Sequence, residues 1–169
     1  PLTNILAGIP SIVYGFFGLT VIVPLSREMF GGGGMNLFTT SLVLGIMILP
    51  TVISISENSL RAVPKSFYEG ALALGATKER AIFRTVFPAA SSGVLTAIIL
   101  GMGRAIGETA AITLICGNID NIPTSLAEPF ITLASAIASG MGYASTTNLE
   151  RPALIAVAAV LLIIILLIT

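Results

Sequence analysis

The chain has 169 residues, of which 55% are hydrophobic and 9% are charged, and its eight basic side chains balance its eight acidic ones. Soluble domains carry about 25% charged residues, so this composition excludes a soluble globular protein and indicates a membrane protein. The sequence has no histidine and a single cysteine, Cys116, which excludes an intrachain disulfide and a cysteine zinc site. We expect Cys116 to be a small buried apolar side chain.

Four apolar stretches are long enough to cross a bilayer, because a transmembrane helix needs about 20 residues. These expected spans lie near residues 5–25, 37–55, 91–117 and 152–169. Prolines in or near them should kink or bound the helices; they are Pro10, Pro24 and Pro50. We therefore expect residues 1–169 to form one all-α, polytopic transmembrane helical bundle. Because the chain starts without methionine and ends in an apolar run, we expect it to be part of a larger subunit.

The first connection, residues 26–36, contains the glycine run Gly31–Gly34. A phosphate-binding loop places a lysine and a serine or threonine directly after its last glycine, and this run is followed by Met and Asn. We therefore expect a flexible turn at this position.

The middle connection, residues 56–88, is basic. It contains five of the eight basic residues, namely Arg61, Lys65, Lys78, Arg80 and Arg84. Cytoplasmic loops of membrane proteins carry an excess of Lys and Arg, so we expect this loop to lie in the cytoplasm. The connections 26–36 and 118–151 should then face outward.

The same loop contains signals for two helices. Ser66 and Glu69 fit a capping box that starts a short helix, and Gly75 suits the left-handed residue that ends it. Thr77 can cap a second helix, "KERAIFRTVF", which Pro88 is expected to close. We expect a short helix, a sharp turn and a basic helix that project into the cytoplasm.

The segment "EGALALGATKERAIFRTVFP" resembles the EAA loop of binding-protein-dependent ABC importer permeases. It matches that pattern at Glu69, Ala71, Gly75 and Pro88, and it departs from it at Gly70, Thr85 and Phe87. The resemblance implies a coupling helix that docks in a cleft of a cytoplasmic ATPase subunit. The residues it assigns to that contact are Ser66, Tyr68, Glu69, Gly70, Ala71, Gly75 and Lys78. The alternative is an ordinary folded loop between two spans.

Small residues recur along the third span at helical spacing. One row is Gly93, Ala97, Gly101 and Ala105, and a second is Gly103, Gly107 and Ala111. Such rows let helix backbones approach closely, so we expect this helix to pack centrally against several neighbours.

The third span also contains two charged residues, Arg104 and Glu108, in the stretch "GRAIGETAAI". A lone charge at the bilayer centre costs about 2.5–3.5 kcal/mol on insertion scales. Because the two residues are four apart, their side chains are expected to meet on one helical face. The pair could be a structural ion pair, or it could line a substrate pathway, where an arginine fork suits oxyanions such as phosphate.

Three segments together resemble the phosphate-specific (Pst) ABC permeases of the MetI-like type, and PstC-type subunits more than PstA-type ones. They are "LAGIPSIVYGFFGL", "SLRAVPKSFYEGALALGAT" and "GMGRAIGETAAITLICGN". The resemblance implies an ABC importer permease for inorganic phosphate in a bacterial or archaeal plasma (inner) membrane. It places Arg104, Glu108 and Thr109 in the substrate pathway.

The resemblance also implies partners. They are a second, PstA-type permease subunit, a PstB-type ATPase dimer that binds ATP and Mg, and a PstS-type extracytoplasmic phosphate-binding protein. This chain would itself hold no cofactor, catalyse no covalent step and bind no nucleic acid.

Glu108 poses a problem for phosphate passage, because a carboxylate repels a dianion. It could hold Arg104 in the resting state, which we favour, or it could accept a hydrogen bond from a protonated phosphate oxygen. Three other functions remain open: an importer for sulfate or molybdate, an ion-coupled secondary transporter, and a structural membrane subunit. The outward loop 118–151 contains "EPFITLASAIASGMG", which is apolar enough to lie on the membrane or dip into it.

Overall fold

The structure, a computed structural model, describes residues 8–144 and 149–169. Residues 5–7 of the first expected span and residues 145–148 of the outward loop lie outside the described residues. Within the described ranges every element is helical, as predicted. The elements are α2 (Ser11–Phe17), the π-helical turn η1 (Gly18–Ile22), α3 (Val23–Phe30), α4 (Leu37–Ala62), α5 (Lys65–Ala73), α6 (Lys78–Ala81), the π-helical turn η2 (Ile82–Val86), α7 (Phe87–Ala89), α8 (Ser91–Gly107), α9 (Ala110–Ile115), α10 (Leu133–Met141) and α11 (Glu150–Ile168).

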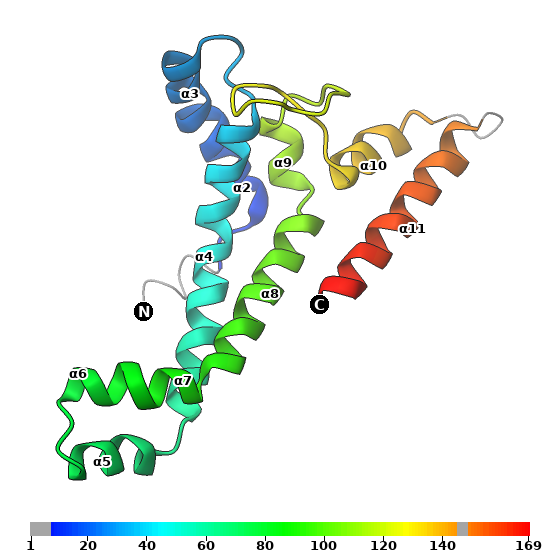
Figure 1. Cartoon of the computed structure of the whole chain (residues 1–169). Coiled ribbons are helices and arrows are strands. Elements are labelled where there is room, and N and C mark those ends of the chain that lie inside the picture. The colour runs from blue at the N-terminus through cyan, green and yellow to red at the C-terminus, as the bar shows by residue number, and fades with distance from the viewer. Residues whose placement is uncertain (1–7, 145–148) are drawn as a thin grey trace.

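Two long antiparallel helices, α4 and α8, form the centre of the molecule (Figure 1). At one end of this pair, α5 and the continuous segment α6–α7 fold back on each other; we call residues 65–89 the foot. At the opposite end lie α3, α9, the connection after α9, and α10. The last helix, α11, runs back from that end beside α8.

Three helical segments are long and apolar enough to cross a membrane: Ser11–Phe30, Leu37–Ala62 and Glu150–Ile168. A fourth crossing is possible if Lys78–Ala89 and Ser91–Gly107, which are bent by 64° at Ala90, count as one segment. Helix α4 continues seven residues past the expected span, because a helix does not have to end where the apolar sequence ends. Its polar last turns contain an ion pair between Arg61 and Glu57, with 2.8 Å between Nη2 and Oε1.

The small residues of α8 face two different neighbours. A Cβ placed on Gly101 would lie 2.7 Å from Cγ2 of Val52 in α4, so only glycine permits this close approach. In the second row, a Cβ on Gly103 would lie 2.6 Å from Cγ2 of Thr169 at the end of α11. Ala97 is fully buried. The prediction that this helix packs against several neighbours is confirmed.

The N-terminal helices pack on α4 and α9. Pro10 precedes the first turn of α2, where its missing N–H needs no partner. The largest buried cluster joins Tyr14, Ile22 and Val23 to residues of α4 and α9. Cys116 is fully buried, as predicted, and its thiol lies 3.2 Å from Oδ1 of Asn118.

The connection after α9 caps the start of α4. The backbone N–H of Leu37 donates to the carbonyl of Glu128 at 3.1 Å, and that of Phe38 donates to the carbonyl of Leu126 at 2.9 Å. The next N–H, of Thr39, donates to the side-chain oxygen of Asn36 at 3.0 Å. The first three amides of a helix have no intrahelical partner, so the outer loop and the N-cap together satisfy all three here.

The glycine run before α4 forms a turn, as predicted. Gly31, Gly32 and Gly34 have positive φ angles, which side chains other than glycine rarely adopt. The turn is closed by buried polar contacts: Nδ2 of Asn36 donates to Oγ of Ser26 at 2.8 Å, and the Thr39 hydroxyl donates to the carbonyl of Gly34 at 2.8 Å.

Candidate functional site

The first helix of the foot begins two residues earlier than the sequence predicts. Helix α5 starts at Lys65 after Pro64, and no side chain caps its first turn. The prediction that Ser66 is the N-cap of a capping box is therefore wrong. Pro64 already has the extended conformation of a residue before a helix, with ψ of 137°, so Ser66 lies inside the first turn with helical backbone.

The turn between the two helices of the foot is as predicted. Gly75 has a φ of 84°, and two hydrogen bonds close the end of α5: Gly75 N–H to the carbonyl of Leu72 at 2.9 Å and Ala76 N–H to that of Ala71 at 3.1 Å. This pair of bonds defines a Schellman motif. The Thr77 hydroxyl then accepts from the N–H of Arg80 at 3.3 Å and caps α6.

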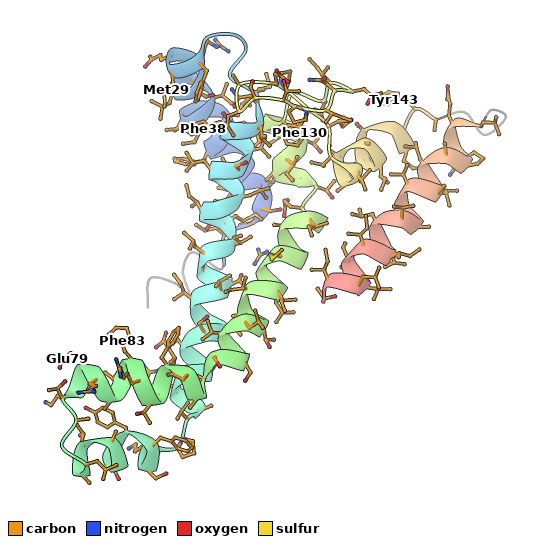
Figure 2. The ribbon with its side chains drawn as sticks, viewed as in Figure 1. Met29, Phe38, Glu79, Phe83, Phe130 and Tyr143 are labelled. Atoms are coloured by element: carbon orange, nitrogen blue, oxygen red, sulfur yellow. The ribbon has the colours of Figure 1, made fainter. Side chains whose placement is uncertain are left out.

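The foot presents the residues that the resemblance assigns to ATPase docking. Ser66, Glu69, Gly70, Gly75 and Lys78 are exposed, and Tyr68 and Ala71 are half-buried. Two apolar side chains that the sequence analysis missed lie beside them: Leu74 is 90% exposed and Phe83 is 70% exposed. Figure 2 shows Phe83 and Glu79 on the α6 side of the foot. The sequence does contain a signal for Leu74, because it is a large apolar residue directly before Gly75, the glycine that ends α5.

Large exposed apolar side chains on a basic projection are typical of a protein interface. Shallow depressions of about 380 and 530 Å³ lie along the foot. Tyr68 and Glu69 line the larger depression and Gly70 and Ala71 the smaller; the two depressions share no lining residue, so the predicted docking residues are divided between two faces of the foot.

Arg104, the second candidate site, bonds across the helix pair. Its Nη1 donates to the hydroxyl oxygen of Thr51 in α4 at 2.8 Å. The expected ion pair with Glu108 is absent: in residues 8–144 and 149–169 the structure contains one salt bridge, between Arg61 and Glu57. The prediction that Arg104 and Glu108 meet on one helical face is wrong.

The reason is a break in the helix. Helix α8 ends at Gly107, and Glu108 has an extended backbone with ψ of 130°, so the spacing of four residues no longer places the two side chains together. Oε1 of Glu108 accepts the N–H of Ala111 in the first turn of α9 at 3.1 Å. Thr109 precedes α9, and its hydroxyl donates to the carbonyl of Gly107 at 3.2 Å. The expected third span, 91–117, is thus two helices joined at Glu108 and Thr109.

This arrangement leaves the Arg104 guanidinium with unused donors. A guanidinium carries five N–H groups, and within the described residues that of Arg104 makes one hydrogen bond, to Thr51. The side chain is exposed in this chain. An arginine inside the membrane faces protein or water rather than lipid. A break in a membrane helix is likewise tolerated only where it is buried in protein or lines a water-filled cavity. Arg104, with donors that no described residue uses, and the break at Glu108 therefore lie on a face that is expected to contact protein or water.

In the described residues, an all-helical architecture with several helices long and apolar enough to cross a membrane defines an integral membrane protein. A family model described as binding-protein-dependent transport system inner membrane component matches residues 1–169, and the chain belongs to that family.

Curated relatives are similar over nearly the whole chain. The probable ABC transporter permease protein YqgH of Bacillus subtilis is 41% identical over 164 residues, which cover 96% of this chain and 53% of the relative. The phosphate transport system permease proteins PstC of Pasteurella multocida and Haemophilus influenzae are 37% and 38% identical over 181 residues, covering 95% of this chain and 56% and 57% of the relatives. The chain spans about half the length of these relatives. No solved structure matches it.

Proposed function

We propose that this chain forms part of the translocation pathway of an ATP-driven ABC importer for inorganic phosphate. The observation that carries the proposal is the Arg104 guanidinium, which within the described residues bonds only to Thr51 and makes no ion pair with Glu108. The names of the relatives, two of them phosphate transport permeases, support phosphate as the substrate. Guanidinium groups bind phosphate by charge-assisted, often bidentate hydrogen bonds.

The proposed pathway residues are Arg104, Glu108 and Thr109. Transporters commonly place their substrate site where a membrane helix is interrupted, and Glu108 and Thr109 form such an interruption between α8 and α9. Glu108 makes no ion pair with Arg104 in this structure. The structure therefore does not support the hypothesis that Glu108 holds Arg104 in the resting state. Oε2 of Glu108 remains available to accept the O–H of a protonated phosphate, a donor that sulfate lacks at neutral pH.

The proposed partners follow from this function. The foot would dock on a cytoplasmic ATPase dimer that binds ATP and Mg, with Ser66, Tyr68, Glu69, Gly70, Ala71, Gly75 and Lys78 in the contact. A second permease subunit would cover the exposed face that carries Arg104, and a phosphate-binding protein would deliver substrate at the opposite end. This chain would then perform no covalent chemistry. The membrane would be a bacterial or archaeal plasma membrane, and the chain would bind no nucleic acid.

The test is ATP-dependent uptake of radiolabelled phosphate by the complete transporter in proteoliposomes that contain its binding protein. Arg104→Ala should abolish uptake, because it removes the membrane-embedded anion-binding group, while the variant still co-purifies with the ATPase. Wild-type uptake by Arg104→Ala would refute the pathway role.

Two other transport functions have their own readouts. If sulfate or molybdate, and not phosphate, offered by the binding protein stimulated ATP hydrolysis, the importer would serve that oxyanion. Uptake driven by an ion gradient in the absence of ATP would indicate a secondary transporter.

A further inference from the structure

Among the described residues, Thr51 is the one side chain that bonds to Arg104, and no sequence motif singles it out. Its hydroxyl oxygen accepts from Nη1 of Arg104 at 2.8 Å, across the seam between α4 and α8. The seam is tight at this level because Gly101 lies against Val52. Thr51 is 14 residues from the start of α4 and 11 from its end, about 21 and 16 Å at 1.5 Å per residue. It therefore lies near the middle of α4.

The hydroxyl proton of Thr51 is uncommitted in the described part of the chain. Several helical hydroxyls here donate to the carbonyl four residues earlier, as those of Thr40, Ser59, Thr96 and Thr113 do. Thr51 makes no such bond; its recorded hydrogen bond is the one it accepts from Arg104. A hydroxyl has one donor and two acceptor lone pairs, so accepting from the guanidinium leaves its proton free to donate.

We propose that Thr51 is a substrate-contacting residue, which donates its hydroxyl proton to a phosphate oxygen while its lone pair orients the Arg104 guanidinium. This inference rests on the proposed function. The hydroxyl and Nη1 lie side by side, and the remaining guanidinium N–H groups supply further donors to the same anion. A group that accepts from arginine and donates to phosphate polarises both bonds in the same direction, which strengthens each.

The experiment uses the complete transporter in proteoliposomes and measures phosphate uptake per assembled complex. Thr51→Val keeps the shape of the side chain and removes the hydroxyl, so uptake should fall by about tenfold, the scale of one hydrogen bond to a charged group. Thr51→Ser keeps the hydroxyl and should retain at least half of the wild-type rate. If the valine variant fails to assemble, Thr51→Ala makes the same deletion without adding bulk.

Thr96→Val is the matched control. The Thr96 hydroxyl donates to the carbonyl of Ser92 at 2.9 Å and lies eight residues before Arg104 on α8, about 12 Å along the helix. Its loss should leave uptake unchanged. An equal loss in Thr96→Val, or an equal loss in Thr51→Ser and Thr51→Val, would show a general packing defect and overturn the proposal.

Arg104→Ala separates the two levels of inference. If Arg104→Ala abolishes uptake and Thr51→Val transports at the wild-type rate, only the role of Thr51 is refuted. If Arg104→Ala itself transports normally, the proposed anion pathway fails, and the role of Thr51 fails with it.

Discussion

At the scale of single residues, the backbone around Glu108 decides what its carboxylate does. Four residues separate Arg104 from Glu108, and in an unbroken helix this spacing brings side chains together. The helix ends at Gly107, however, and Oε1 of Glu108 accepts from Ala111 at the start of α9. A carboxylate is stabilised at a helix N-terminus by the free N–H groups and the helix dipole. Glu108 therefore stabilises the interruption, and Arg104 bonds to Thr51.

Replacing Glu108 tests this role. Glu108→Ala removes the acceptor of the Ala111 N–H and should lower the stability of the purified complex by about 1 kcal/mol, the usual cost of losing such a cap. Glu108→Gln keeps an acceptor oxygen and should lose less. Thermal unfolding in detergent provides the measurement. Glu57→Ala is the control, because the exposed Glu57–Arg61 pair contributes little. Equal melting temperatures for Glu108→Ala and wild type would contradict the capping role.

At the scale of elements, the outer connection and α4 form one unit through backbone hydrogen bonds. The carbonyls of Leu126 and Glu128 accept from the first two amides of α4. The Glu128 carboxylate in turn accepts from the N–H and the hydroxyl of Thr124, at 2.8 and 2.9 Å. These two hydrogen bonds, the backbone one first, lower the pKa of Glu128 below its ordinary value. The side chain thus holds the loop in the shape that caps α4.

This cap should weaken in acid. Because the pKa of Glu128 is lower in the folded state than in the unfolded chain, its contribution is fully present at neutral pH and is lost as the pH falls through the lowered folded value. Amide exchange of Leu37 and Phe38, corrected for its intrinsic pH dependence, should therefore accelerate below that pH. The acceleration should be modest, since Glu128 is only half-buried.

Two variants provide the comparison. In Glu128→Gln, the amides of Leu37 and Phe38 should exchange fast already at neutral pH, and their exchange should not accelerate further in acid. Asp120→Asn, which neutralises an exposed carboxylate in the same connection, should behave as wild type. If amide exchange in Glu128→Gln accelerated in acid as much as in wild type, the pH dependence would belong to another group.

At the scale of the whole molecule, the foot and the outer connection lie at opposite ends of the α4–α8 pair (Figure 1). The charge distribution predicts that the foot is cytoplasmic. Docking on a cytoplasmic ATPase requires a cytoplasmic foot, so the proposed coupling depends on this orientation.

Cysteine labelling tests the orientation. In a Cys116→Ala background, Lys78→Cys in the foot should react with a membrane-impermeant maleimide in inside-out vesicles and stay protected in intact cells. Ile122→Cys, at a position 87% exposed in the outer connection, should show the reverse pattern. Labelling of Lys78→Cys from outside would overturn the topology and, with it, the proposed docking of the foot.

The sequence by itself was sufficient for the features that depend on local chemistry. The apolar stretches predicted a helical membrane protein, the small-residue rows predicted close helix packing, and Gly75 and Thr77 predicted the turn in the foot. These features follow from residues close together in the chain, whose conformational preferences do not need distant contacts.

Only the tertiary structure decided the partners of Arg104 and Glu108. The break after Gly107 is specified by a backbone conformation that no strong sequence signal announces, and the Arg104–Thr51 bond joins residues 53 positions apart. The capping of α4 by Leu126 and Glu128 likewise uses backbone carbonyls from a distant connection. Such contacts depend on how whole helices pack, because a side chain in a membrane helix bonds to whatever polar group the neighbouring helix brings within reach.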